Sequence, residues 1–213
     1  MYLPKPFEES RPEALHAFMR AHPLATIVLH AEGELSADHV PLMLRPHPAP
    51  NGRLLGHVAR ANPLWRRAGQ GAPCLAVFRG VDHYISPNAY ATKRETGKVV
   101  PTWNYEAVHV NGAIRAIDDR AWLRGFLETL THEHERAQPH PWRVDDAPLD
   151  YVETMLGAVV GIEIDVQRIV GKAKLSQNQP AENRRSLVAA LRAAGDPSST
   201  AMADAIESRE PRG

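Results

Sequence analysis

The stretch Val99–Ile117, VVPTWNYEAVHVNGAIRAI, carries the strongest local fold signal in the sequence. Its second half is rich in strand-forming residues on either side of Asn111-Gly112. An Asn-Gly pair is typical of a two-residue type I′ turn, because both positions of that turn require a positive φ. The stretch therefore predicts a β-hairpin in which Val110 faces Ala113. Pro101 cannot donate a ladder hydrogen bond, so it should lie at a strand start or a sheet edge.

This hairpin would present a polar and aromatic surface where the chain enters the sheet. One face carries rings and small side chains, namely Trp103, Tyr105, Ala107, His109, Ile114 and Ala116. Opposed alanines flanked by rings leave a shallow slot that a flat ligand can occupy. The alternative is a tight barrel corner in which Trp103 is a plug and the small residues let two sheets approach. On the other face, Glu106 and Arg115 should form a diagonal ion pair.

The remaining patterns predict several short strands and a few helices. Helices are expected over residues 12–21, where Ser10 and Glu13 form a capping box, over 62–69, after a cap at Asp118 or Asp119, and over 182–194. Strands are expected over residues 24–30, 35–44, 53–59, 74–80, 83–87 and 158–166, and the AEGE turn should join the first two in a hairpin. This order favours an α+β fold with a small antiparallel barrel. We expect one domain over residues 1–194 and a loosely ordered polar tail over 195–213.

Composition limits the classes of function. The 213 residues include 25 Lys and Arg and 25 Asp and Glu, so no broad basic field marks a nucleic-acid-binding protein. The single cysteine, Cys74, cannot form an internal disulfide and is expected to be buried as a small apolar residue. The N-terminus has no basic leader or apolar signal segment, and no apolar run is long enough to cross a bilayer, so we expect a soluble, cytoplasmic protein.

Two further segments combine polar groups with the end of a strand or the start of a helix. In GHVARANPLWRR, Arg60 offers a planar fork to a phosphate or carboxylate, and Asn62 supports it. The alternative is a solvated arginine beside a turn. In KAKLSQN, Lys174, Ser176 and Gln177 supply a charge, a hydroxyl and an amide before a helix. The alternative there is capping of that helix by Asn178 or Gln179, and capping is compatible with ligand binding.

Several familiar chemistries are not indicated. His132 and His134 in THEHERAQPH lie two positions apart, about 200° around a helix, so they do not form an HExxH zinc motif and no metal is expected. The sequence contains no GxSxG, P-loop or GxGxxG motif. This argues against a nucleophile-elbow hydrolase, a P-loop NTPase and a Rossmann cofactor site.

Six segments taken together resemble a known family. In order, they are MYLPKPF, DHVPLML, GHVARANPLW, YISP, VPTWNYEAVHVNG and KLSQN, and they extend from Met1 to about Leu191. They resemble the signature segments of the PaiB-like family of FMN-binding split-barrel proteins. The resemblance implies an antiparallel, Greek-key-like split β-barrel with flanking helices, forming a homodimer with FMN in a cleft between the subunits.

The resemblance also implies site residues. By matched motif, the FMN-binding candidates are His57, Arg60, Asn62, Thr102, Trp103, Asn104, Lys174, Ser176 and Gln177. Arg60 and Lys174 would hold the phosphate, because a dianion in a cleft needs paired positive charge. No catalytic residue is assigned. The chain departs from the family at Val81 and Asn88-Ala89, where the family has a proline and Ser-Trp, and Tyr90 would cover part of the gap that the missing tryptophan leaves.

Three functions are compatible with this resemblance. Members are described as negative transcriptional regulators, and related split barrels include flavin reductases, other flavin-dependent oxidoreductases and haem-degrading proteins. Direct DNA contact has little support from the residues, because no helix-turn-helix pattern is present and the last predicted helix carries only Arg184, Arg185 and Arg192. FMN binding ranks first, an oxidoreductase is the alternative, and haem binding ranks last.

Overall fold

A computed structural model describes residues 1–48 and 51–209. Residues 49–50 and the last four residues of the expected tail lie outside these ranges. The helices are α1 (Pro12–Ala21), α2 (Leu64–Ala68), α3 (Lys93–Thr96), α4 (Arg120–Glu135), α5 (Leu149–Gly157), α6 (Ala181–Ala194) and α7 (Pro197–Glu207). The strands are β1 (Glu8–Glu9), β2 (Leu24–Ala31), β3 (Glu34–Pro41), β4 (Met43–Arg45), β5 (Arg53–Ala59), β6 (Gln70–Ile85), β7 (Thr102–Ile117) and β8 (Val159–Lys174). Short 3₁₀ helices lie at η1 (Lys5–Phe7), η2 (Pro87–Ala89) and η3 (Val144–Asp146).

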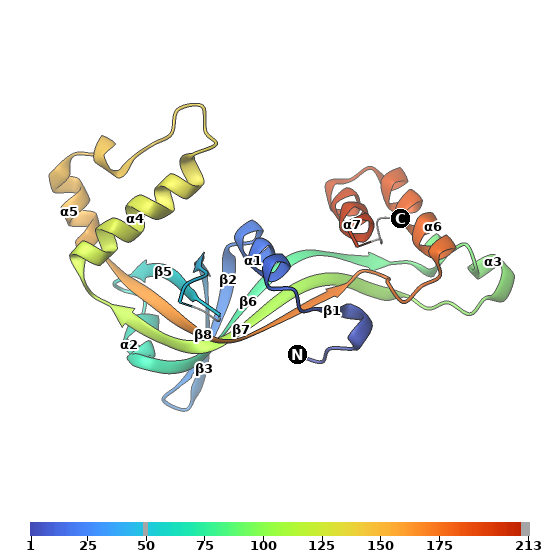
Figure 1. The fold of residues 1–213 in the computed structure, drawn as a ribbon, viewed down its shortest axis with the longest axis horizontal. Helices are drawn as coiled ribbons and strands as arrows, with labels where there is room; N and C mark the ends of the chain where they lie inside the picture. Colours follow the sequence, from blue (N-terminus) through green and yellow to red (C-terminus); the bar gives the residue numbers. More distant parts are fainter. Residues whose placement is uncertain (49–50, 210–213) are drawn as a thin grey trace. The chain divides into compact units, whose positions relative to one another are not determined.

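The strands form one eight-stranded sheet, so the expected α+β class is confirmed (Figure 1). Their order is β3-β2-β6-β7-β8-β5-β4, and β1 pairs with β8. The expected hairpin of β2 and β3 is present, with Thr26 opposite His39 and a hydrogen bond of 3.0 Å between their side chains. β3 also contacts β5, so this part of the sheet curls.

The predicted turn at Asn111-Gly112 is wrong, because β7 runs through both residues as one strand of 16 residues. Gly112 does not have the positive φ that the turn requires. A Cβ on Gly112 would lie 2.5 Å from the carbonyl oxygen of Asp165 and 2.6 Å from a methyl group of Ile164. Glycine therefore suits position 112 because β8 approaches it too closely for a side chain, and not because the backbone turns there.

Because β7 is one continuous strand, the residues that share each of its faces differ from those predicted for a hairpin. Side chains alternate along a straight strand, so Ile114 and Ala116 lie on the opposite face from Trp103, and the slot that was predicted from their pairing does not form. The predicted ion pair of Glu106 with Arg115 is also wrong, because nine residues of strand separate them by about 30 Å. Arg115 instead donates to the buried carboxylate of Glu163, at 2.9 Å from its Nε.

The other two long strands also exceed their predicted lengths. The separate segments expected over 74–80 and 83–87 are joined in β6, which ends at Ile85. The strand expected over 158–166 continues to Lys174. Its predicted apolar face is confirmed, since Val160, Ile162 and Ile164 are fully buried.

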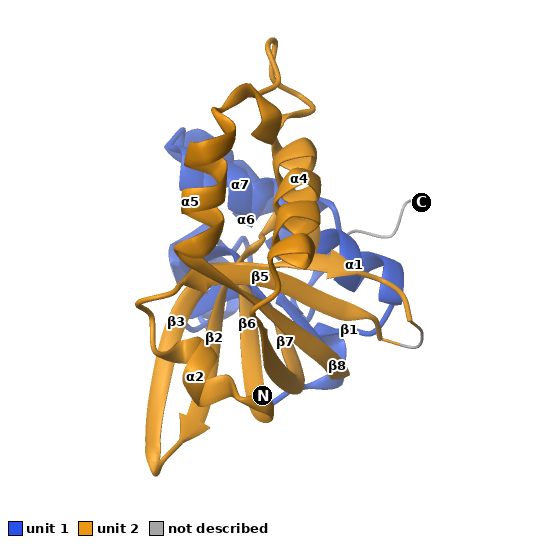
Figure 2. Cartoon of the chain, turned by 90° about the vertical axis from the view of Figure 1, so that its left-hand side faces the viewer, with its two compact units in different colours: residues 1–18, 79–108, 170–213 blue, residues 19–78, 109–169 orange. Residues whose placement is uncertain are grey.

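The chain divides into two compact units, and β6, β7 and β8 each contribute residues to both (Figure 2). The first unit comprises residues 1–18, 79–108 and 170–213, and the second comprises 19–78 and 109–169. In the second unit, alternate residues of the strands fill the core, including Ile27, Leu54 and Phe78.

The expected loose tail is corrected by α7, which belongs to the core of the first unit. Met202, Ala203 and Ile206 of α7 are buried against Leu187 of α6 and Ile85 of β6. The apolar residues of α7 recur at helical spacing within a segment that is polar on average, so its composition alone does not indicate an amphipathic helix.

Local signals placed α1, α2, α4 and α6 correctly, whereas α3 and α5 were not predicted. Asp119 caps α4, and its carboxylate accepts a hydrogen bond of 2.7 Å from the backbone N–H of Trp122. The helix expected over 182–194 is α6. Cys74 is buried as predicted, and burial raises the pKa of its thiol to about 11. Within the described ranges, none of the helices combines the length and the apolar character that crossing a bilayer demands.

Candidate functional site

In the first unit, the start of β7 and the end of β8 bring together four of the predicted site residues. The ammonium group of Lys174 donates to the hydroxyl of Thr102 at 2.5 Å. The amide of Asn104 donates to the hydroxyl of Ser176 at 3.0 Å. Seventy-two residues of sequence separate each pair, so the two motifs PTWN and KLSQ meet in space.

These two pairs differ in their burial. Asn104 and Ser176 are buried, at 0% and 3% exposure, whereas Thr102 and Lys174 are half-buried. Ser176 has a φ of 63°, which is unusual for a residue with a side chain. Strained backbone of this kind persists only where the surroundings fix it, and it concentrates at ligand sites.

Lys174 has no carboxylate within ion-pair distance among residues 1–48 and 51–209. A half-buried ammonium without a counter-ion favours the approach of an anion. Lys172, two positions earlier in the same strand, was not predicted as a site residue. Its ammonium is buried, donates to the backbone carbonyl of Tyr2 at 3.1 Å and lies 5.0 Å from the ring centroid of Tyr105. The KAK spacing at the end of β8 is the sequence signal that would have included it.

Two other predicted residues of this unit have different surroundings. The side-chain amide of Gln177 accepts from the N–H of Leu175 and donates to the carbonyl of Ala173, so it holds its own turn together. Trp103 is 52% exposed, and its indole N–H donates to Asp82 at 2.9 Å. The rings of Trp103 and Tyr84 lie 6.1 Å apart, which makes an exposed aromatic pair.

The remaining three predicted residues belong to the second unit. Arg60 forms a two-point ion pair with Asp118, at 2.6 and 2.8 Å, and donates to the backbone carbonyls of Gly157 and Val159. All three guanidinium nitrogens therefore have partners within the unit. The Asp118 carboxylate raises the pKa of Arg60, and the guanidinium lowers the pKa of Asp118.

Asn62 and His57 also have local partners. The amide of Asn62 donates to Asp38 at 2.7 Å and accepts from the N–H of Leu64 at 2.8 Å, at the start of α2. The His57 ring packs edge-on to Phe126 at 6.0 Å, and burial lowers its pKa. The sequence pattern located these residues at the exit of β5 but gave no indication of Asp38 and Asp118, which are distant in sequence.

A metal site finds no support in the described part of the chain, where no three His, Cys, Asp or Glu side chains are grouped to hold an ion. What the first unit offers is a half-buried ammonium group with the hydroxyl of Thr102 beside it. Such a donor set is suited to binding a phosphate or the polar edge of a ring system.

Comparison with known proteins finds a matching family and relatives that align with nearly the whole chain. Residues 1–168 match the family described as "Putative FMN-binding domain". A protein of Emericella nidulans is 31% identical over 98% of this chain and 97% of its own length. The Protease synthase and sporulation protein PAI 2 of Bacillus subtilis is 29% identical over 98% of both chains.

The fold of this chain resembles those of several solved structures. The FAD and heme binding protein of Mycobacterium smegmatis is similar with a TM-score of 0.58 and 18% identity, over 78% of this chain and 73% of that one. The flavocytochrome Anf3 of Azotobacter vinelandii is similar with a TM-score of 0.54 and 16% identity, over 78% and 69%. The family match over most of the chain, together with the full-length relatives, shows that this protein belongs to the PaiB-like FMN-binding domain family.

Proposed function

We propose that the protein binds FMN and that Lys174 is the main anchor of its phosphate. The observation that carries this proposal is the meeting of PTWN and KLSQ around an ammonium group without a carboxylate partner in the described ranges. A phosphate dianion in a cleft needs a positive charge and several hydrogen-bond donors. Lys174 supplies the charge and Thr102 supplies a hydroxyl beside it, and the buried hydrogen bond from Asn104 to Ser176 joins the two motifs.

Arg60 has a smaller part in this proposal than the sequence implied. Its fork is held by Asp118 and by two backbone carbonyls, so a phosphate would have to displace a two-point ion pair. Both partners of that pair are partly solvated, at 36% and 52% exposure, and exchange of a solvated pair has a modest cost. Arg60 is accordingly held within its own unit, and its role in phosphate binding stays a prediction.

The experiment compares FMN with riboflavin, which has the same ring and no phosphate. Flavin fluorescence is titrated with the wild-type protein and with Lys174→Ala, using Lys98→Ala, an exposed lysine in the α3–β7 connection, as the matched control. Loss of one charge-assisted interaction should weaken FMN binding about 10- to 100-fold and leave riboflavin affinity nearly unchanged. Equal losses for both flavins, or no loss for FMN, would remove Lys174 from the phosphate site.

We further propose a homodimer in which the flavin cleft lies between subunits. Its support is the exposed pair Trp103 and Tyr84, at 52% and 49%, because paired aromatic rings in water are typical of surfaces that a partner or ligand covers. Light scattering after size-exclusion chromatography should give twice the 23.6 kDa chain mass. Trp103→Ser should shift the protein toward monomer and weaken flavin binding together; a wild-type monomer that binds FMN would exclude the interfacial cleft.

A regulatory role is proposed from the Bacillus subtilis relative, whose name links it to protease synthesis and sporulation. Direct DNA contact has weak geometric support, because Arg192 of α6 is paired with Asp204 and Glu207. Regulation through a flavin-dependent contact with another molecule fits better. A gel-shift assay with the upstream region of its own gene should show no salt-sensitive binding. A specific shift would instead support regulation by direct DNA contact.

The FMN-loaded protein also tests the alternative activities. A flavin carries its own redox chemistry when bound, and the protein positions and tunes it. Bleaching of the flavin absorbance by NADH or NADPH would support the oxidoreductase. A shifted Soret band on mixing with haemin would support haem binding.

A further inference from the structure

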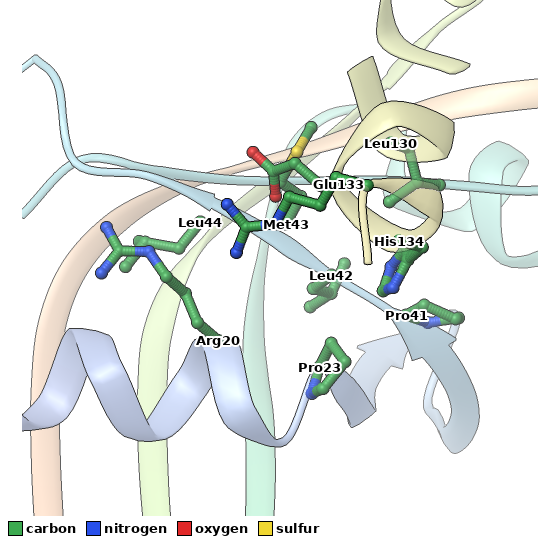
Figure 3. Close-up of a pocket in the computed structure, with 10 residues that line it drawn as sticks. Arg20, Pro23, Pro41, Leu42, Met43, Leu44, Leu130, Glu133 and His134 are labelled. Atoms are coloured by element: carbon green, nitrogen blue, oxygen red, sulfur yellow. The ribbon is translucent and has the colours of Figure 1, made fainter. Parts of the chain in front are cut away.

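The second unit contains a cavity of about 140 Å³ that is separate from every predicted flavin residue. It lies between the C-terminal end of α1, the strand β4 with the residues before it, and the C-terminal half of α4 (Figure 3). In Figure 3, Arg20 extends from α1, and Glu133 and His134 come from α4.

The base of this cavity is apolar and well fixed. Leu42, Met43 and Leu44 are 2%, 6% and 6% exposed, and Leu130 of α4 completes the lining. The N–H of Leu42 donates to the carbonyl of Pro23 at 2.8 Å, which joins two walls of the cavity. A Cβ on Gly56 would lie 2.9 Å from a methyl group of Leu42, so glycine at that position lets the leucine side chain take its place.

The rim of the cavity is cationic. Arg20 and Arg136 line it, and neither has an acidic partner within ion-pair distance in the described ranges. The one carboxylate at the rim, Glu133, is already paired with Arg45, at 3.9 Å. His134 adds an imidazole N–H that can donate a hydrogen bond. The rim therefore has an excess of positive charge over an apolar base.

We propose that this cavity binds a small monocarboxylate with an apolar body. A dry apolar cavity of about 150 Å³ in another protein accommodates benzene, so the volume here suits a single ring or a short aliphatic chain. The apolar body would cover Leu42 and Leu44, and the carboxylate would be shared by the two guanidinium groups. Inorganic phosphate lacks the apolar part, and FMN is several times too large for the space.

The test is calorimetric titration with benzoate as the probe and benzyl alcohol as its neutral counterpart. A ligand of about nine non-hydrogen atoms held in this way should bind one-to-one with a Kd of ~1 mM. Arg20→Gln and Arg136→Gln should each weaken benzoate binding about 3- to 5-fold, which is the range for partly solvated ion pairs. Arg168→Gln, at an exposed position of β8, is the matched control and should bind benzoate as the wild type does.

Three results would overturn the proposal. One is equal affinity for benzoate and benzyl alcohol, and another is the absence of saturable benzoate binding up to about ten times the expected Kd. The third is loss of benzoate binding when FMN is saturating, since that would place the probe in the flavin site. All the substitutions are at exposed positions, so unchanged thermal unfolding should confirm that the variants are folded.

Discussion

The path of β7 through Asn111-Gly112 makes a direct prediction about Asn111→Val. Asn111 is exposed in the middle of the strand and forms no hydrogen bond through its side chain with the described residues. Valine is favoured in strands, so the substitution should change the free energy of unfolding by no more than about 0.5 kcal/mol, in the stabilising direction. In a type I′ turn, valine would have to take a positive φ, at a cost of about 1 to 2 kcal/mol.

Gly112→Ala tests the packed side of the same strand, where the expected loss of stability can be worked out from the contact with β8. The new Cβ would lie 2.5 Å from the carbonyl oxygen of Asp165, and backbone cannot move aside as a flexible side chain can. Overpacking of this kind costs about 1 to 3 kcal/mol. For a chain of this size, each kcal/mol lowers Tm by about 2 to 4 °C, so the variant should melt about 2 to 12 °C below the wild type.

Both variants are measured by thermal unfolding followed by far-ultraviolet circular dichroism and by urea titration. The combination expected for a strand is a neutral or stabilised Asn111→Val with a destabilised Gly112→Ala. A loss of more than about 1 kcal/mol in Asn111→Val would refute the continuous strand, because only positive φ at residue 111 gives valine that penalty.

Three further predictions concern single groups. Glu9→Gln should remove about 2 kcal/mol of stability at pH 7, because hydrogen bonds from Arg11, with Arg209 adding to them, lower the pKa of Glu9 from 4.5 to about 2. The pKa of Glu9 is lower in the folded than in the unfolded protein, so its contribution to stability is present above about pH 5 and is lost as the pH falls toward 2. An acid-unfolding profile that is the same in Glu9→Gln as in the wild type would contradict this assignment. Cys74, with its pKa raised to about 11 by burial, should react with a thiol reagent at pH 8 at least about 100-fold more slowly than in urea, and equal rates would show that it is not buried. Asp119→Ala should cost about 1 kcal/mol in urea titrations by removing the cap of α4, whereas Asp119→Asn should retain most of it.

Much of the candidate site was visible in the sequence, although its geometry was not. The motifs PTWN and KLSQ identified Thr102, Asn104, Lys174 and Ser176, which the structure brings into contact. Their pairing across 72 residues depends on which strands are neighbours, and no local pattern encodes that order. The sequence does not reveal the partner of Arg60 for the same reason, since Asp118 lies 58 residues away and its local pattern indicates only a helix cap.

The sequence by itself determined the elements whose stability is local: the capped helix α4, the amphipathic helix α6, the hairpin of β2 and β3 and the apolar face of β8. Caps, apolar periodicity and short turns act between residues a few positions apart, so they can be seen without a fold. Only the tertiary structure decided that Asn111-Gly112 is strand, that α7 is core and that Arg60 is already paired. At each of these positions the deciding contact comes from a distant segment: the Asp165 carbonyl against Gly112, the apolar face of α6 against Met202, and the Asp118 carboxylate against Arg60.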